Sequence, residues 1–265
     1  GTLICLHPST PFLNNKPTAD TETTKIKNIV NEHFTEMKFI NGNNIFDSAD
    51  LMVPLSITKV IKIKDSRIFV TYSHFDSSIK TKNKYQNVES IFLHGNDLVL
   101  SIKNKIVKKN IKSISNFLFR NGYTNNFYIK INRISGHAPN KGDKAVNPDF
   151  YQLLYKKDEF DFNRILTTKP EGKKDTGGAL NELAFSNKNE LKNGFEYLKT
   201  KFARFCLSLR KTGSDLNNID LEFVPYMDFS QEWSDKKLFD YFELTQEEIN
   251  FVNEYIQDWY EQDTK

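Results

Sequence analysis

Three residues near the N-terminus, Asp20, Glu36 and Lys38, have the types and the spacing of a metal-dependent nuclease site. In such sites carboxylates hold Mg²⁺ and a lysine helps to position the attacking water. The expected elements argue against this use, because Asp20 falls in a loop before a helix and Glu36 at the far end of that helix, not on paired strands. Charged residues make up 27% of the chain, so such triplets also arise by chance, and a nuclease is the weakest alternative.

Other catalytic patterns are missing from the sequence. It contains no glycine-rich nucleotide-binding loop, no H-E-x-x-H and no G-x-S-x-G. The five histidines are scattered, and the two cysteines, Cys5 and Cys206, stand in separate apolar segments without the spacing of metal ligands. We therefore expect no metal site and assign no catalytic residue in this chain.

The distribution of charge is more informative than its sum, which is only +3. Residues 101–144 contain ten basic residues and one acid, with Tyr123, Phe127 and Tyr128 among them. Cations that displace counterions, together with rings that stack on bases, suit a surface that follows a nucleic-acid backbone. We expect these cations to gather on one concave wall of a β-rich region. The alternative is an ordinary solvated lysine face.

The C-terminal end has the opposite charge. From Asp228 onward the chain contains eleven acids and three lysines. We expect this segment to form a solvated helical surface that repulsion keeps away from nucleic acid.

The first 64 residues alternate between strand and helix patterns. Apolar residues predict strands at 3–7, 37–40 and 51–63, and a helix at 23–34. This order is typical of the closing portion of an α/β sheet whose first strands are not in the chain. The chain also begins without methionine on an apolar run, which we expect of a piece cut from a longer polypeptide.

The rest of the chain is expected to form a second domain of α+β type. The longest helical pattern covers 187–211, where an apolar stripe recurs every three or four residues after a possible N-cap at Ser186. Ser234 and the capping-box sequence at 245–248 predict two further helices, and a short helix is expected at 113–120. Short apolar runs between polar turns predict strands at 68–72, 88–93, 98–102, 127–131 and 150–155.

The segment Asn147-Pro-Asp-Phe150 resembles the loop with which adenine methyltransferases grip the amino group of a flipped base. In that loop main-chain carbonyls accept hydrogen bonds from the amine while an aromatic ring holds the base. Here Asp149 replaces the second proline, and no glycine-rich S-adenosylmethionine loop follows a nearby strand. We therefore interpret the segment as a surface turn that leads into the expected strand at 150–155.

Two stretches resemble the large adenine-N6 DNA methyltransferases of type II restriction-modification systems. Residues 1–12 are similar to the strand and loop that follow the Asn-Pro-Pro-Tyr motif of those enzymes, and residues 41–59 to their last two strands. The helix with Tyr197-Leu-Lys-Thr-Lys-Phe-Ala-Arg-Phe205 resembles one near their C-terminal ends. So does the stretch from Phe223-Val-Pro-Tyr-Met-Asp-Phe229 to residue 249.

The resemblance implies the end of a Rossmann-like methyltransferase sheet, of α/β type, at residues 1–64, and an α+β target-recognition domain with C-terminal helices at 65–265. The full enzyme would bind S-adenosylmethionine, extrude an adenine and methylate its amino group. Its cofactor loop and its Asn-Pro-Pro-Tyr loop would lie upstream of Gly1, so we expect no catalysis by this chain alone. Phe46 is a candidate for a ring that stacks on the extruded base, with an ordinary sheet-core phenylalanine as the alternative.

Sequence recognition needs side chains that neutralise phosphates and side chains that reach base edges. Arg133 is our candidate for reading a base, because arginine can bond guanine through two hydrogen bonds, but the sequence does not rank it above Arg120 or Arg164. The candidate DNA-contacting residues are Lys103, Lys105, Lys108, Lys109, Arg120, Arg133, His137, Asn140, Lys141, Lys144, Lys201 and Arg204.

The resemblance implies two partners: double-stranded DNA, and the missing N-terminal methyltransferase part or a subunit that carries it. A stand-alone DNA-specificity or adaptor subunit without catalysis is the alternative. No run approaches the roughly 18 apolar residues of a membrane-spanning helix, and no signal peptide is recognisable. We therefore expect a cytoplasmic protein without a membrane partner.

Overall fold

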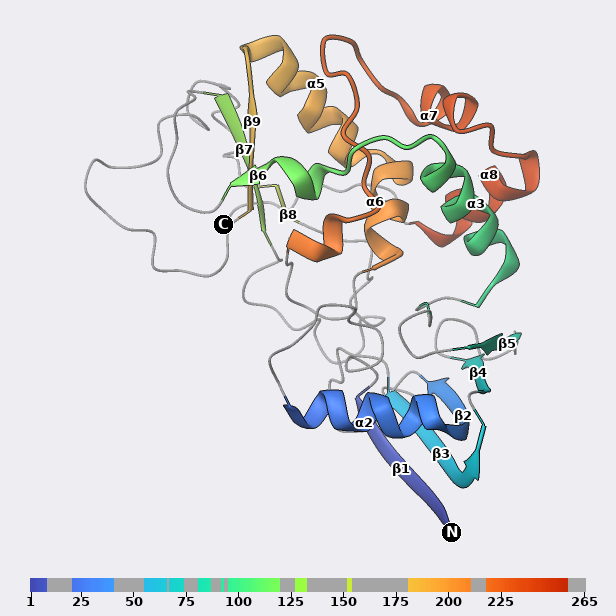
Figure 1. The fold of residues 1–265 in the computed structure, drawn as a ribbon. Helices are drawn as coiled ribbons and strands as arrows, with labels where there is room; N and C mark the ends of the chain where they lie inside the picture. The colour runs from blue at the N-terminus through green and yellow to red at the C-terminus, as the bar shows by residue number, and fades with distance from the viewer. Residues whose placement is uncertain are drawn as a thin grey trace, which may run out of the picture. The chain divides into compact units, whose positions relative to one another are not determined.

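The structure is a computed structural model that describes residues 1–8, 21–40, 55–65, 67–73, 81–86, 92, 95–119, 127–132, 152–153, 181–210 and 218–256. Over these residues the protein is of mixed α/β type, with six α-helices and two sheets (Figure 1). The chain divides into two compact units, the first covering Gly1–Leu100 and the second beginning at Ser101.

The first unit is built on a five-stranded mixed sheet in the order β1-β3-β2-β4-β5. Its strands are β1 (Thr2–Pro8), β2 (His33–Ile40), β3 (Leu55–Lys64), β4 (Ile68–Ser73) and β5 (Thr81–Tyr85). β3 lies antiparallel between β1 and β2, so that β1 and β2 run in the same direction, and the helix α2 (Thr21–Glu32) lies between them in the chain. β2 and β4 are parallel, and β5 is the antiparallel partner of β4.

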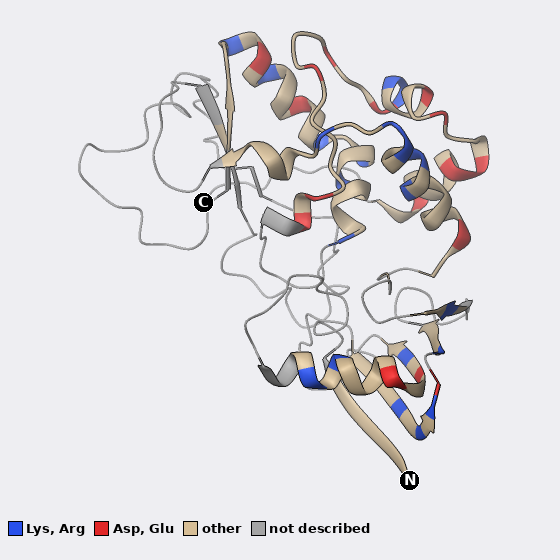
Figure 2. Cartoon of the chain, in the orientation of Figure 1, with Lys and Arg blue, Asp and Glu red and all other residues tan. Residues whose placement is uncertain are grey.

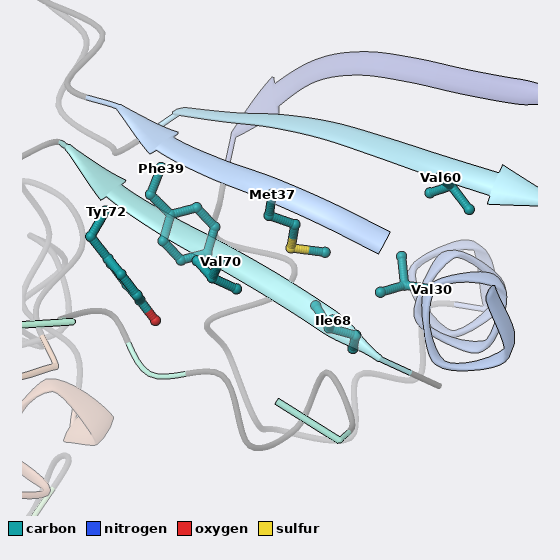
Figure 3. Packing of buried hydrophobic residues seen from close by; sticks show 7 residues of the cluster. All are labelled: Val30, Met37, Phe39, Val60, Ile68, Val70 and Tyr72. Carbon is teal, nitrogen blue, oxygen red and sulfur yellow. The ribbon is translucent and has the colours of Figure 1, made fainter. Parts of the chain in front are cut away.

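One face of this sheet forms the core of the first unit. Alternation along β2 buries Thr35, Met37 and Phe39, because successive side chains of a strand point to opposite faces. Figure 3 shows the side chains of β2, β3 and β4 on the side of the sheet where α2 lies. The other members of this cluster are Val30 on α2, Val60, Ile68, Val70 and Tyr72.

The elements expected in the first 64 residues are present with shifted ends. β2 begins at His33, directly after α2, rather than at residue 37. The sheet also continues beyond residue 64, because β4 and β5 belong to it. The domain boundary expected at residue 64 therefore falls inside the first unit, which extends to Leu100.

The second unit contains a four-stranded antiparallel sheet in the order β6-β9-β7-β8. Its strands are β6 (Leu118–Phe119), β7 (Phe127–Asn132), β8 (Gln152–Leu153) and β9 (Asn181–Phe185). Its helices are α5 (Lys188–Lys199), α6 (Lys201–Ser208), α7 (Asp235–Tyr241) and α8 (Gln246–Tyr255), with 3-10 turns η3 (Ile114–Phe117) and η5 (Asn218–Leu221). The helix α3 (Asp97–Lys108) spans the division between the units.

The strand expected at 98–102 is wrong, because these residues belong to α3. Val99, Ile102 and Ile106 are buried at helical spacing. The side chain of Asn96 accepts hydrogen bonds from the main-chain N–H groups of residues 98 and 99, at 2.9 and 3.3 Å, and so starts the helix. A short apolar run does not distinguish a strand from a buried helix segment. The helix expected at 113–120 is the 3-10 turn η3 followed by β6.

The single helix expected at 187–211 is two helices, α5 and α6, that meet at Thr200. Thr200 has a ψ angle of 150°, outside the helical region, and serves as the C-cap of α5 and the N-cap of α6. Its hydroxyl donates to the Tyr197 carbonyl at 2.7 Å and accepts from the Ala203 N–H at 3.2 Å. The N-cap of α5 is Asn187 rather than Ser186.

A carboxylate from a distant segment completes the start of α6. Asp235, in the first turn of α7, accepts hydrogen bonds from the N–H groups of Lys201 and Phe202 at 3.1 and 2.8 Å. The first N–H groups of a helix have no partner within it, and a negative charge there also interacts favourably with the helix dipole. The break at Thr200 is therefore stabilised both locally and by α7.

α6 is the most deeply buried helix of the second unit among those described. Phe202 stacks on Phe242 with ring centroids 4.7 Å apart, and Phe205 contacts the rings of Phe251 and Tyr255 on α8 at 6.3 Å. In α5, Gly194 allows the ring of Phe185 to approach, since a Cβ atom at this position would overlap it. The apolar stripe predicted for this region is thus confirmed as core.

The N-caps predicted for the last two helices are confirmed. Ser234 accepts a hydrogen bond from the Lys237 N–H, and Thr245 and Glu248 form a reciprocal capping box. Among the helices that the structure describes, each is too short or too polar to cross a bilayer.

Replacement of Asp235 by alanine tests the long-range cap. Because Asp235→Ala leaves two N–H groups of α6 without their acceptor, we expect the free energy of unfolding to fall by about 1–2 kcal/mol. Urea denaturation followed by circular dichroism measures this difference. Asp240→Ala, an exposed acid on the same helix, is the matched control and should change stability by less than about 0.5 kcal/mol. Equal effects of the two changes would contradict the cap.

Candidate nucleic-acid interface

Four described lysines of the basic segment lie on and just after the helix α3, whereas Lys130 lies on strand β7. Lys103, Lys105 and Lys108 are on α3, and Lys109 follows it in a turn. The expectation of cations gathered on strands is therefore wrong for these four residues. The remaining candidates of this segment, together with the ring of Phe46, lie outside the described residues: Arg120, Arg133, His137, Asn140, Lys141 and Lys144.

Two of these lysines bind acids of the C-terminal segment. Figure 2 shows basic positions along α3 and acidic positions along α7 and α8. Lys105 Nζ lies 2.6 Å from Glu248 Oε2 and donates to the carbonyl of Glu243 at 2.7 Å. Lys109 Nζ lies 2.7 Å from the Glu243 carboxylate and 5.1 Å from the centre of the Tyr241 ring. The acidic segment was expected to be a solvated surface repelled by nucleic acid. Instead, two of its acids neutralise lysines of the basic segment.

The two ion pairs differ in burial. The side chain of Glu248 is 2% exposed, whereas that of Glu243 is 75% exposed. Burial by itself raises the pKa of the Glu248 carboxyl, but hydrogen bonds from Lys105, from Ser101 Oγ at 2.7 Å and from the Thr245 N–H at 2.7 Å outweigh it, so the pKa is lowered. Glu248 is therefore a buried carboxylate whose negative charge is stabilised by Lys105.

Lys103 lies on the opposite side of α3 and is half-buried. Its ammonium group is 5.8 Å from the centre of the Phe223 ring. Burial lowers its pKa, and the nearby charge of Glu222 opposes this effect. Glu222 also pairs with Arg210 at 3.4 Å. The environment of Lys103 is thus partly apolar and partly occupied by other charges, which makes it a poor phosphate ligand.

Among the cations of this segment whose burial the structure describes, Lys108 and Lys112 are exposed. Lys112 Nζ lies 5.9 Å from the centre of the Phe117 ring, which stacks on Tyr226 with centroids 4.0 Å apart. An exposed cation beside an aromatic pair has the chemistry needed to contact a phosphate and an adjacent sugar or base. Sequence reasoning did not select Phe117 or Tyr226, because they are distant in the chain and only the fold brings them together.

Arg204 does not fit the expected role in DNA binding. It is 1% exposed within α6, and its Nε donates to the Lys199 carbonyl at 3.3 Å. A side chain enclosed in the core does not reach a phosphate at the surface, so we remove Arg204 from the candidates. Lys201, in the first turn of the same helix, donates to the carbonyl of Asn253 at 3.1 Å.

The residues of the proposed nuclease triplet are placed differently from the expectation. Glu36 and Lys38 lie on strand β2 and not at a helix end, and Glu36 pairs with Lys59 of β3 at 3.4 Å. Asp20 lies outside the described residues. No group of three or more histidine, cysteine, aspartate or glutamate side chains that could hold a metal occurs in the described part of the chain. These residues provide no support for a nuclease.

Comparison with known proteins does not identify a family. No family model matches the sequence, and no curated protein is significantly similar to it.

The buried ion pair is tested by Lys105→Met, with Lys109→Met as the matched control one helical turn away. We expect Lys105→Met to lower the free energy of unfolding at pH 7 by about 3 kcal/mol, because it leaves a buried carboxylate unpaired. Lys109→Met should cost less than about 1 kcal/mol, because its partner is exposed. Urea denaturation measures both.

The pH dependence distinguishes loss of this charge pair from loss of packing. In the wild type, the lowered pKa of Glu248 contributes stability above the pKa of the unfolded chain, and this is lost as the pH falls through the folded pKa. In Lys105→Met, burial should raise the pKa of Glu248 above its unfolded value, so protonation relieves the defect. The difference between variant and wild type should therefore shrink from pH 7 to about pH 4. A difference independent of pH would contradict the assignment.

Proposed function

We propose that this chain is the DNA-recognising C-terminal part of a site-specific adenine-N6 DNA methyltransferase of a restriction-modification system. In this proposal the chain binds duplex DNA, and catalysis belongs to polypeptide that carries the cofactor loop and the Asn-Pro-Pro-Tyr loop. The observation that carries the proposal is the run of residues 101–119, which has five lysines and no acid. Lys108 and Lys112 are exposed, and Lys112 lies beside the Phe117–Tyr226 pair.

The topology of the first unit supports the proposed domain order. β1 and β2 run in the same direction with α2 between them in the chain, and β3 is inserted antiparallel. Sheets that combine parallel strands with an antiparallel one are common in α/β proteins. This arrangement agrees with the expectation that the first unit is the closing portion of a larger α/β sheet.

The segments that carry the methyltransferase resemblance in the second unit pack against each other. Tyr197 donates its hydroxyl hydrogen to the Pro225 carbonyl at 2.8 Å, and the Asn193 amide donates to the Phe229 carbonyl at 3.0 Å. The rings of Tyr197 and Phe229 are 5.6 Å apart. These residues are core residues, so the resemblance supports a shared fold of this unit, while the DNA contacts rest on the exposed lysines.

The sequence lacks both methyltransferase loops, so we assign no S-adenosylmethionine site to this chain. The methyl group of that cofactor would be supplied on the polypeptide that contains the loops. The role left to this chain is to hold DNA and to position the site to be modified.

DNA binding is tested with the double variant Lys108→Glu/Lys112→Glu and a fluorescein-labelled duplex. We expect salt-dependent binding by the wild type, an affinity at least about tenfold lower in the variant, and a decrease of about 2 in the slope of log affinity against log salt. Fluorescence anisotropy at several salt concentrations measures both quantities.

The control carries the same change of charge elsewhere. Lys192 and Lys236 are exposed on α5 and α7, so Lys192→Glu/Lys236→Glu should reduce the affinity much less. Absence of salt-dependent binding by the wild type, or an equal loss in both double variants, would overturn the proposed interface. Transfer of a labelled methyl group from S-adenosylmethionine to DNA by this chain alone would overturn the assignment of catalysis to other polypeptide.

A further inference from the structure

Large apolar side chains are exposed mainly in the first unit. Seven of the nine exposed large hydrophobic residues found among the described residues belong to β1, α2 and β3, and only Val107 and Tyr241 belong to the second unit. The seven are Leu3, Ile4, Leu6, Ile26, Ile29, Ile57 and Ile63. Three of them, Ile4, Leu6 and Ile57, lie on one face of the sheet in neighbouring strands. Neighbouring exposed apolar residues mark a binding site more often than scattered ones do.

β1 is at the edge of the sheet, and within the described residues no strand pairs with its outer side. Gly1 lies opposite Lys62, and its carbonyl oxygen accepts a hydrogen bond from the Lys62 N–H at 2.9 Å. The main-chain groups of the odd-numbered residues of β1 therefore form the hydrogen bonds to β3. The N–H and C=O groups of Thr2, Ile4 and Leu6 consequently point toward the free edge. This edge offers a row of main-chain donors and acceptors to another strand.

Most of the usual protections of an edge strand are missing from β1, in which a proline, Pro8, occurs only at the last residue. Edge strands generally carry lysines, inward-pointing charges or bulges that prevent further pairing. Thr2–Pro8 contains no lysine, arginine, aspartate or glutamate, and its register with β3 is unbroken. Its side chains are also apolar on both faces, with Leu3 55% exposed on one face and Ile4 65% exposed on the other. Strands with this pattern are typical of sheet interiors that are covered on both sides.

On the sheet face opposite α2, exposed apolar side chains on β1 give way to charged side chains on β2. Residues directly opposite each other in neighbouring strands share a face. Leu6 lies opposite Ile57 of β3, and Ile57 lies opposite Lys38 of β2. In the next row Ile4 lies opposite Lys59, which pairs with Glu36. The exposed apolar side chains are therefore concentrated beside the free edge, whereas charged side chains occupy the central strands.

The charges around this apolar surface are mostly positive. On this face Lys38 of β2 is exposed and Lys59 of β3 pairs with Glu36, which is the one acid within β1, β2 and β3. Lys62, opposite Gly1, lies on the other face with Leu3. A protein surface that covers the apolar side chains and carries acids at its rim would complement both features.

We propose that the free edge of β1 takes up a β-strand of another polypeptide, and that apolar side chains flanked by acids on this polypeptide cover Ile4, Leu6 and Ile57. Strand addition at an open edge uses main-chain hydrogen bonds for affinity and side-chain contacts for specificity. The identification of this polypeptide as the catalytic methyltransferase part rests on the proposed function, while the docking edge itself does not depend on DNA binding.

A second copy of this chain would not cover the exposed apolar side chains beside the edge. In a closed pair of antiparallel β1 strands the two-fold axis is perpendicular to the sheet, so equivalent faces of the two copies lie on the same side. Each copy would extend the other's sheet but leave Ile4, Leu6 and Ile57 uncovered. The occupant must supply both a strand and a layer over this face.

The edge is tested on the full chain with the acetylated and amidated peptide Glu-Val-Thr-Val-Thr-Val-Glu as the strand probe. The same peptide with proline in place of its central valine is the negative control. We expect the strand peptide, at saturation, to slow hydrogen exchange of the Thr2, Ile4 and Leu6 amides by at least about tenfold. Nuclear magnetic resonance measures the exchange, and light scattering measures the mass.

Two variants of the chain complete the experiment. Because the N–H of Ile4 points outward, Ile4→Pro removes no hydrogen bond to β3 but blocks strand addition, and it should weaken peptide binding at least about tenfold. Ile4→Val keeps a strand-forming side chain and should bind like the wild type. Circular dichroism checks that both variants are folded.

The results separate this inference from the proposed function. No slowing of the three amides by the strand peptide, or equal slowing by the proline peptide, would overturn the docking edge. A wild-type dimer that becomes monomeric in Ile4→Pro would also overturn it, since a second copy would then be the occupant. Protection of the amides in a chain that fails to bind DNA would support the edge and reject the DNA interface.

Discussion

A buried carboxylate constrains the electrostatics of the second unit. Glu248 is almost fully enclosed, and a charge in that position needs a partner close by. Lys105 provides it from a position 143 residues earlier in the chain, and Ser101 and the Thr245 N–H occupy the remaining acceptor positions. This network joins α3 to α8 and makes one lysine of the basic segment a structural residue. The charge available to a ligand is therefore smaller than the residue count indicates.

Local patterns were sufficient to predict most individual elements. Short apolar runs predicted β1 and β4, alternating side chains predicted β3, and short-range capping sequences predicted the starts of α7 and α8. Prediction failed where distant residues decide the structure. The apolar stripe continues through Thr200, but the Asp235 carboxylate stabilises a new helix start there. The division near residue 100 depends on β4 and β5 joining a sheet formed earlier in the chain.

Contacts between distant residues also limited the prediction of the candidate interface, and more strongly than that of the fold. Composition identified a lysine-rich segment, yet it could not show that Lys105 and Lys109 would meet Glu248 and Glu243, more than 130 residues away. It also could not distinguish Arg204, which is enclosed in α6, from an exposed cation. Charge counts along a sequence measure what a segment contains, whereas ligand binding depends on the charges that folding leaves exposed.

The first unit has an exposed sheet edge, and the second has ion pairs that neutralise some of its described cations. In the first, β1 exposes apolar side chains, and no described strand pairs with its outer main-chain groups, an arrangement that another strand would complete. In the second, internal ion pairs leave few described cations for phosphates, so affinity for DNA from this unit alone would be modest. An additional polypeptide bound at β1 would bury the apolar edge and could add its own contacts to the same duplex. Linking two binding surfaces in this way raises overall affinity without any new contact in either one. In the proposed function, weak DNA binding by this chain and an open sheet edge would therefore be consistent parts of one arrangement, in which recognition and assembly depend on each other.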